Sequence, residues 1–427
     1  MTAPSKDFHP GLEYARQLET LDELAAFRAE FVINDPDLIY LDGNSLGRLP
    51  KASLARLQTA AREQWGERLI RGWGEGWYDA PRRLGDQLAG LLGAAPGQIV
   101  VGDSTTVNFF KLVMAALEFQ GQRSAIVSDE LNFPTDLYTL QNCMRLLGGR
   151  HSLKVLTSPD GIHADEQTIF DSMDASTALI TFSTPTFKSG FLYDVPAITA
   201  AAHRAGALVL WDFSHGGGSI PIELDAWGVD FAVGCTYKYL NGGPGSPAWL
   251  YVRKDLQQKV LSPIGGWWAH CSPFAFDLDF TPAEGISRFL AGTPSMLSLL
   301  MVEPALEIAL RAGMPAIRQK SVALTSFMAA LVDHTLVPLG FSLGSPRDPQ
   351  RRGSHISIRH ADAYRINLAL IHEMKVIPDF REPDNLRLGL TPLYTTFEEV
   401  WEAVQRIGAV VTEKRHEKYS QQRSSVT

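Results

Sequence analysis

Lys238 is the first residue whose surroundings suggest chemistry. It follows the apolar run FAVGCT, lies between Tyr237 and Tyr239, and precedes the glycine-rich run LNGGPGSP. The apolar run predicts a buried strand, and burial near a strand's end favours the neutral form of an amine. A neutral amine can form a Schiff base with a carbonyl compound. The alternative, a lysine that emerges into solvent, carries equal weight on this local pattern.

Asp212 ends the run ALVLWD and is followed by Phe213, Ser214, His215 and three glycines. A carboxylate paired with a pyridine nitrogen keeps that nitrogen protonated, so that the ring withdraws electrons, and such sites combine the acid with a lysine. Asp212 could instead cap a turn. His215 could bind the same cofactor or be an ordinary packed histidine.

Two further segments could hold the phosphate and the ring of a cofactor. The sequence from Gly102 to Thr106 precedes VNFFKLVMAALEF, which has helical spacing, so hydroxyl residues open a helix whose free N–H groups attract anions. Plain helix capping is the alternative. Phe133 follows the predicted strand SAIVSDE and could stack on a planar ring or belong to the core. Asp136 could be a polar partner or a turn former.

The elements that must position these residues alternate between strands and helices. SAIVSDE, TALITFST, ALVLWDFSH and FAVGCTYKYL predict buried strands of a mostly parallel sheet, which indicates an α/β fold. Ligand-binding groups gather at the carboxyl ends of such strands, where Ser183, Asp212 and Lys238 fall. We expect a large domain over 61–303 and a smaller α+β domain over 304–427, with an N-terminal arm, 1–60, packing against the smaller domain.

Composition bounds the class of function. The 427 residues, 45% of them hydrophobic and 20% charged, predict a globular protein of two domains. A net charge of −8 argues against nucleic acid and favours a small-molecule substrate. Three widely spaced cysteines predict neither a disulfide framework nor a metal site, and indicate a cytoplasmic protein. No signal peptide and no membrane span are predicted.

Taken in order, the hydroxyl-rich helix start, FPTD, WDFSH and TYKYLNGGPG resemble fold-type I pyridoxal-phosphate enzymes of the class V aminotransferase group. Three more segments narrow the resemblance: LDGNSLG at 41–47, GGWW at 265–268 and RLGLTPLY at 387–394. With YKYLNGGPG at 237–245 they resemble kynureninase over nearly the full chain. The resemblance implies a PLP-dependent transferase-like fold, whose large domain carries a mostly parallel sheet of the seven-stranded type.

The resemblance also implies roles for single residues. Lys238, Tyr237 and Asp212 are expected to be catalytic, with Lys238 bonded to pyridoxal phosphate and Asp212 paired with its ring nitrogen. Arg387 is expected to bind the substrate α-carboxylate, a task suited to its forked guanidinium. Further substrate contacts are expected from Asn44 and Trp73, although Trp65 and Trp77 lie close to Trp73 in sequence. The remaining cofactor contacts are expected from Thr105, Thr106, Phe133, Pro134, Thr135, Asp136, Ser183 and His215, and from Trp267 and Thr293 of a partner subunit in a homodimer with shared active sites.

The implied activity is hydrolysis of L-kynurenine, and of 3-hydroxy-L-kynurenine, to anthranilate or 3-hydroxyanthranilate and L-alanine in tryptophan breakdown. Gly292-Thr293 favours kynurenine as the preferred substrate, again by resemblance. One alternative is another class V enzyme, such as a cysteine desulfurase or selenocysteine lyase. A desulfurase needs a reactive loop cysteine, for which Cys271 is the one candidate in a predicted loop. The other alternative is a non-catalytic homologue that keeps the fold.

Overall fold

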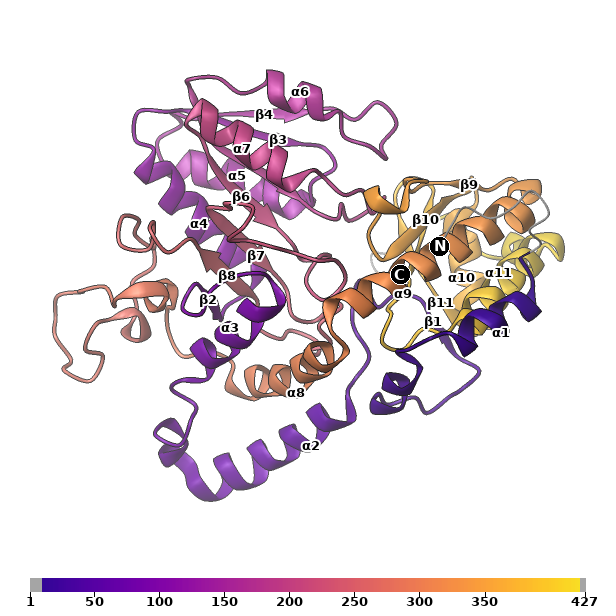
Figure 1. The fold of residues 1–427 in the computed structure, drawn as a ribbon, viewed down its shortest axis with the longest axis horizontal. Coiled ribbons are helices and arrows are strands. Elements are labelled where there is room, and N and C mark those ends of the chain that lie inside the picture. The colour runs from indigo at the N-terminus through magenta and orange to yellow at the C-terminus, as the bar shows by residue number, and fades with distance from the viewer. Residues whose placement is uncertain (1–9, 423–427) are drawn as a thin grey trace.

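The computed structural model describes residues 10–422, and its larger part is built on a seven-stranded sheet (Figure 1). The strand order is β2-β8-β7-β6-β5-β3-β4, and β4, β3, β5, β6 and β7 run parallel to one another. Only β8 is antiparallel, to both of its neighbours. This confirms the predicted α/β fold with a mostly parallel sheet. The strands are β2 (Ile99–Val101), β3 (Ala125–Asp129), β4 (Ser152–Leu156), β5 (Thr177–Ser183), β6 (Leu208–Asp212), β7 (Phe231–Gly234) and β8 (Trp249–Val252).

Both faces of this sheet are buried. Leu179 and Ile180 are neighbours in β5 but lie in two different apolar clusters, as do Val209 and Leu210 in β6. Because successive strand residues point to opposite faces, helices must cover the sheet on both sides, which explains why these strands are continuous apolar runs. The helices of this part are α3 (Ala80–Leu91), α4 (Thr105–Phe119), α5 (Pro134–Leu146), α6 (Glu166–Asp171) and α7 (Val195–Ala205).

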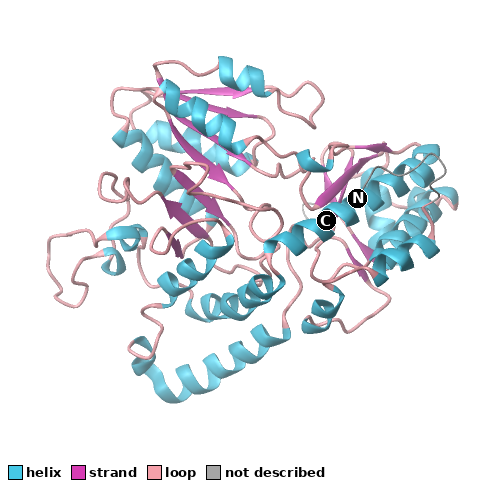
Figure 2. Cartoon of the chain, in the orientation of Figure 1, coloured by secondary structure: helices cyan, strands magenta, loops and turns pink. Residues whose placement is uncertain are grey.

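The smaller part has an antiparallel sheet of order β12-β13-β10-β9 with its own core. A short parallel pair, β1 with β11, joins the N-terminal arm to it. Figure 2 shows helices packed to one side of these strands. The elements are α1 (Leu12–Thr20), β1 (Ile39–Tyr40), α9 (Met314–Leu331), β9 (Ser342–Leu343), β10 (His355–Arg359), α10 (Ala363–Glu373), β11 (Val376–Ile377), β12 (Asp379–Arg381), β13 (Asn385–Gly389) and α11 (Phe397–Thr412).

Two helices join the parts. α8 (Met296–Ala312) packs in the core of the larger part and contains Pro304, so the predicted boundary at 303/304 falls inside a helix. The N-terminal arm divides as well: Ala15 of α1 belongs to the smaller core, whereas α2 (Lys51–Thr59) packs along α8. The domain boundaries remain a prediction. Short helical turns complete the chain at Ala25–Glu30, Ala60–Arg68, Leu69–Trp73, Trp267–Ala269, Gly285–Phe289, Val332–Leu336, Val337–Leu339, Pro349–Arg351 and Arg415–Lys418.

The helical stretch Met314–Leu339 is long and apolar enough to cross a membrane by length and composition, with a hydropathy of 1.5. Its Leu324, Met328 and Leu331 are fully buried in the core of the smaller part. Core helices of globular proteins meet the same two criteria, so the stretch is weak evidence for a span.

Candidate active site

Polar side chains converge where β5 and β6 end. Ser183 is the last residue of β5, Asp212 is the last of β6, and the two are register partners. The Ser183 hydroxyl donates to Oδ1 of Asn132 and lies 3.4 Å from Oδ2 of Asp136 and 3.5 Å from Oδ2 of Asp212. The structure therefore brings together residues from β5, β6 and the start of α5.

The two carboxylates of this group are both buried. Burial raises the pKa of Asp136 well above its usual value, and the nearby charge of Asp212 raises it further. Neither acid makes an ion pair with a Lys, Arg or His side chain within residues 10–422, and Asp212 Oδ1 accepts a hydrogen bond from the Ser214 N–H at 2.7 Å. Buried acids without a cation need a proton or a positively charged donor. A protonated pyridine nitrogen supplies such a donor, so these residues fit pyridoxal phosphate.

Lys238 lies in a turn that begins after β7, four residues past the strand's last residue, Gly234. Its Nζ is 3.3 Å from Nε2 of His215, and the rings of Phe133 and Tyr237 lie 6.0 and 5.8 Å from it. Burial lowers the pKa of the Lys238 amine. Burial also lowers the pKa of His215 well below its ordinary value, with a further contribution from Lys238. Both shifts favour neutral nitrogens, which suits a lysine that must attack a carbonyl carbon.

Phe133 is presented by a turn that sequence reasoning did not identify. Asp129 Oδ1, at the end of β3, accepts hydrogen bonds from the backbone N–H groups of Leu131 and Asn132, and Asp129 Oδ2 accepts one from the Tyr193 hydroxyl. Asn132 Oδ1 in turn accepts the Phe133 N–H at 2.9 Å. Phe133 is 38% exposed, so its ring is available to a ligand. Pro134 then opens α5, which has Thr135 and Asp136 in its first turn.

The start of α4 fits an anion. Ser104 is the N-cap and accepts from the Val107 N–H, and the backbone of Asp103 has a φ of 53°. The Thr105 hydroxyl oxygen is buried and makes no hydrogen bond among the described residues, whereas Thr106 is exposed. An unpartnered hydroxyl beside the free N–H groups of a 15-residue helix is a site that a phosphate would complete.

Arg387 lies in β13, in the smaller part of the structure, and is 2% exposed. Its Nη1 donates to the Phe187 carbonyl and its Nη2 to the Ser45 hydroxyl, each at 2.7 Å, and Nη2 also pairs with Asp379. Its buried Nε has no acceptor within the described chain. An oxygen ligand such as a carboxylate would supply one.

Asn44 packs against the same strand. It is fully buried, and neither its amide oxygen nor its amide nitrogen has a hydrogen-bond partner in the described residues. A Cβ at Gly389 would lie 2.1 Å from the Asn44 oxygen, so only glycine permits this contact. Asn44 is thus a second buried polar group close to Arg387 that lacks a partner.

Trp73 belongs to an aromatic cluster with Trp77, Trp267 and Trp268, whose ring centroids lie 5.6, 6.0 and 5.3 Å from its own. Trp267 stacks on Trp268 at 5.0 Å, and Thr293 is exposed. Within residues 10–422 no hydrogen bond or ring contact joins this cluster or Thr293 to Lys238.

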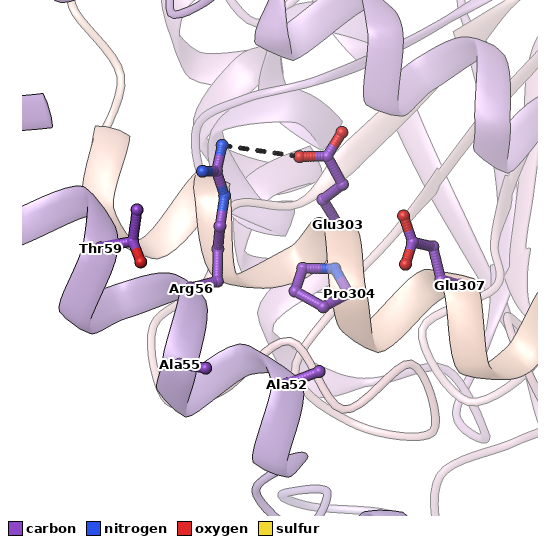
Figure 3. A pocket seen from close by; sticks show the side chains of 7 residues that line it. All are labelled: Ala52, Ala55, Arg56, Thr59, Glu303, Pro304 and Glu307. Carbon is purple, nitrogen blue, oxygen red and sulfur yellow. Dashed lines mark ion pairs between the residues drawn. The ribbon is translucent and has the colours of Figure 1, made fainter.

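A hollow of about 330 Å³ lies between α2 and α8 (Figure 3). In the figure Arg56 reaches toward Glu303, with which it pairs at 3.8 Å, above Ala52 and Ala55. No residue predicted to act in the site lines this hollow, so we assign it no role.

The cysteines do not favour thiol chemistry. Burial raises the pKa of Cys143 to about 12 and also raises that of Cys235. Cys271 is exposed, and its sulfur lies 4.0 Å from Nδ1 of His270. Cys271 is the single accessible thiol of the described chain, and it lies in the segment next to the tryptophan cluster rather than beside Lys238.

The fold is shared with pyridoxal-phosphate enzymes of low sequence identity. A lysine-to-alanine mutant of C-DES with glycine covalently linked to its PLP cofactor superposes with a TM-score of 0.77, at 17% identity, over 89% of this chain and 98% of that one. The apo cysteine desulfurase of Thermococcus onnurineus also gives 0.77, at 16% identity, over 91% and 98%. At such identities the likeness establishes the fold alone.

Sequence comparison is more specific. Residues 317–407 match the family model described as the kynureninase C-terminal domain. The kynureninase of Pseudomonas fluorescens is 42% identical over 402 residues, which cover 93% of this chain and 94% of that protein. The kynureninase of Burkholderia pseudomallei (strain 1106a) is 43% identical over 400 residues, covering 92% and 94%. The chain therefore belongs to the kynureninase family.

Proposed function

We propose that this chain is a pyridoxal-phosphate enzyme that hydrolyses L-kynurenine to anthranilate and L-alanine. The observation that carries the proposal is the identity of 42–43% with kynureninases over more than nine tenths of the chain. The site supports it, because Lys238, Asp212 and Arg387 are all buried or half-buried in settings that suit their tasks. A non-catalytic homologue would have no need of these three residues together.

The cofactor is held by groups from several elements. Thr105, Thr106 and the start of α4 would hold the phosphate, Phe133 would stack on the ring, and Asp212 would accept the ring N–H. Ser183 and Asp136 support Asp212 through the hydrogen-bond group at the ends of β5 and β6. When bound, the cofactor withdraws electrons from the substrate's α-carbon. Pro134, Thr135 and His215 complete the set of contacts.

The chain's own residues move protons and orient the substrate. Lys238 is the base at the substrate's α-carbon, because burial lowers the pKa of its amine and so favours the neutral form. Tyr237 donates a proton near the departing acyl group, since the neighbouring Cys235 and burial raise the pKa of its phenol and so favour the protonated form. Arg387 and Asn44 hold the α-carboxylate end. Water adds to the aryl carbonyl carbon, and the Cβ–Cγ bond breaks to release anthranilate. The electron pair of that bond stays on Cβ, where a proton joins it, and Lys238 returns the proton that it took from the α-carbon, so the second product is L-alanine.

Kynurenine is the preferred substrate in this proposal, and 3-hydroxykynurenine is a slower one. Gly292-Thr293 supports this preference by its resemblance to the bacterial pattern. The test is kcat/KM for both compounds with the purified holoenzyme. A larger value for kynurenine is expected, and a larger value for the hydroxylated compound would overturn the preference.

We propose a homodimer in which Trp267 and Thr293 reach the partner's site. Exposed apolar side chains shortly before Trp73 and shortly after Trp268 support this, since soluble monomers rarely expose such patches. They are Trp65, Leu69 and Ile70 after α2, and Phe274, Phe276 and Leu278 in the segment after Trp268.

Complementation tests the shared site. Lys238→Ala and Trp267→Ala proteins, each inactive alone, are unfolded, mixed and refolded together. Because a mixed dimer restores one intact site only if the two residues come from different subunits, recovery of up to about a quarter of the native activity is expected. No recovery in confirmed mixed dimers would show that the sites are not shared.

We further propose a cytoplasmic location and the domain division 61–303 and 304–427, with the arm 1–60 on the smaller domain. Three unpaired cysteines support a reducing compartment. Separate apolar clusters support two domains. Cell fractionation and limited proteolysis test the two points.

A further inference from the structure

Arg387 and Asp379 are direct register partners on the antiparallel strands β13 and β12. Nη2 of Arg387 pairs with Oδ2 of Asp379, and both side chains are nearly fully buried, at 2% and 5% exposure. Arg381 Nη2 reaches the same Asp379 oxygen at 3.0 Å. Oδ2 of Asp379 thus forms ion pairs with two guanidinium groups.

The guanidinium of Arg387 is fixed from three directions. Asp379 holds it from its own sheet, the Ser45 hydroxyl from the N-terminal arm, and the Phe187 carbonyl from the loop after β5. An arginine has five N–H donors. Both donors of Nη2 and one of Nη1 are therefore used, which leaves the Nε–H and one Nη1–H without an acceptor among the described residues.

The charges around this arginine are balanced before any substrate arrives. Asp42 Oδ1 lies 4.0 Å from Nη2 and makes no hydrogen bond within the described chain. Two cations, Arg381 and Arg387, thus face two acids, Asp42 and Asp379. This arrangement therefore fixes the position of the Arg387 guanidinium for an incoming carboxylate. It does not supply excess positive charge.

A purely structural cross-strand ion pair would explain the Asp379 contact but not the rest. An ion pair that only joins two strands does not require a further contact, such as that with the Phe187 carbonyl in the larger part of the chain. It also does not require buried N–H donors without acceptors. The open donors belong to the residue proposed to bind the α-carboxylate, and the anchors restrict its rotation.

We infer that Asp379 is the positioning residue for Arg387, holding its guanidinium so that the open Nε–H donor receives the α-carboxylate of the substrate. This inference rests on the proposed function. Asp379 itself does not touch the substrate and acts through Arg387.

The test compares two ligands that differ only in the carboxylate. The holoenzyme is titrated with L-alanine and with L-alaninamide while the cofactor's absorbance is followed. In Asp379→Ala the affinity for L-alanine is expected to fall about tenfold or more, whereas that for L-alaninamide changes less than about twofold, because only the acid carries the carboxylate that the guanidinium binds. Asp379→Asn retains a hydrogen-bond acceptor but no charge. Its affinity for L-alanine is expected to be intermediate between that of the native enzyme and that of Asp379→Ala.

A matched control is Asp333→Asn, which removes an exposed bidentate partner of Arg347 in the same part of the chain. It should leave both affinities unchanged. The KM for kynurenine in Asp379→Ala should rise with the L-alanine constant while kcat changes less than about threefold. Equal weakening of both ligands, or no change in either, would overturn the inference. A native enzyme that makes no anthranilate would instead reject the proposed function.

Discussion

The amine of Lys238 lies 3.3 Å from Nε2 of His215, and burial lowers the pKa of both groups. Neither group has an ion-pair partner in the described chain. Two neutral nitrogens can share a hydrogen bond at this distance, whereas two cations would repel each other. The lowered pKa values therefore favour a neutral, hydrogen-bonded pair in which the amine is available to attack a carbonyl carbon.

Replacing Lys238 by alanine should remove the covalent attachment of the cofactor and the base at the α-carbon. The visible absorbance band of the attached cofactor should disappear, and kcat should fall by about 10³-fold or more. Absorbance spectra and anthranilate fluorescence measure the two effects. Lys259→Ala, at an exposed lysine, is the control. A Lys238→Ala enzyme with near-native turnover would exclude this lysine as the base.

Asp212→Asn keeps the shape of the side chain but removes its charge. The ring nitrogen of the cofactor would then lose the partner that keeps it protonated, so kcat should fall about 100-fold or more while the cofactor stays bound. Steady-state kinetics and the cofactor's spectrum measure this, with Asp255→Asn, at an exposed carboxylate, as the control. Native kcat in the variant would show that Asp212 does not carry out this task.

Phe133→Leu should weaken cofactor binding without abolishing it. Aromatic stacking contributes about 0.5–1.5 kcal/mol beyond area burial, so the dissociation constant should rise roughly 2–10-fold. Cofactor titration of the apoprotein measures the change. Tyr138→Leu removes an exposed ring from the same helix, α5, and should have no effect. An unchanged constant in Phe133→Leu would place the cofactor ring elsewhere.

Arg387→Lys should raise the KM for kynurenine about 10–100-fold, because a lysine ammonium cannot reproduce the planar N–H geometry that Asp379, Ser45 and Phe187 hold in place. The change in kcat should be smaller. Arg347→Lys, at an exposed arginine, serves as the matched control in the same kinetic assay. If KM stays native in Arg387→Lys, the substrate carboxylate binds at another residue.

Asp129 should make stability depend on pH. Burial raises its pKa from 3.8 to about 6, so the folded chain holds this proton more tightly than the unfolded chain does. The free energy of unfolding that Asp129 contributes should therefore fall as pH rises from about 4 to about 6, and level off above. Asp129→Asn should lack this change.

Urea unfolding at pH 4, 5, 6 and 7 measures the effect of Asp129. The free energy of unfolding of the native protein minus that of Asp129→Asn should fall over the same interval. A constant difference would mean that the carboxylate is not buried in the folded protein. Asp174→Asn, on the surface, is the control.

Much of the fold could be predicted because its signals are local. The strands β3, β5, β6 and β7 lie within the four apolar runs that predict them. Parallel strands buried on both faces are continuous apolar segments, which sequence shows directly. FAVGCTYKYL is the partial exception, since β7 ends at Gly234 and the rest forms the turn that carries Lys238.

The contacts between distant segments could not be predicted in this way. Asn132, Asp129 and Tyr193 organise the Phe133 turn through side chains up to 64 positions apart, and Asp379 meets Arg387 across two short strands. Hydrophobic periodicity does not predict such side-chain pairings, because they depend on sheet register. Asn132 lies within the NFPTD segment, so the sequence locates this residue. The sequence does not reveal that its amide oxygen accepts the Phe133 N–H.

The central claim is that the holoenzyme hydrolyses L-kynurenine, and the most direct measurement is product analysis of the purified protein incubated with kynurenine and pyridoxal phosphate. The account predicts anthranilate and L-alanine in equal amounts, with no product from Lys238→Ala. Consumption of L-cysteine with release of sulfide, but no anthranilate from kynurenine, would contradict it.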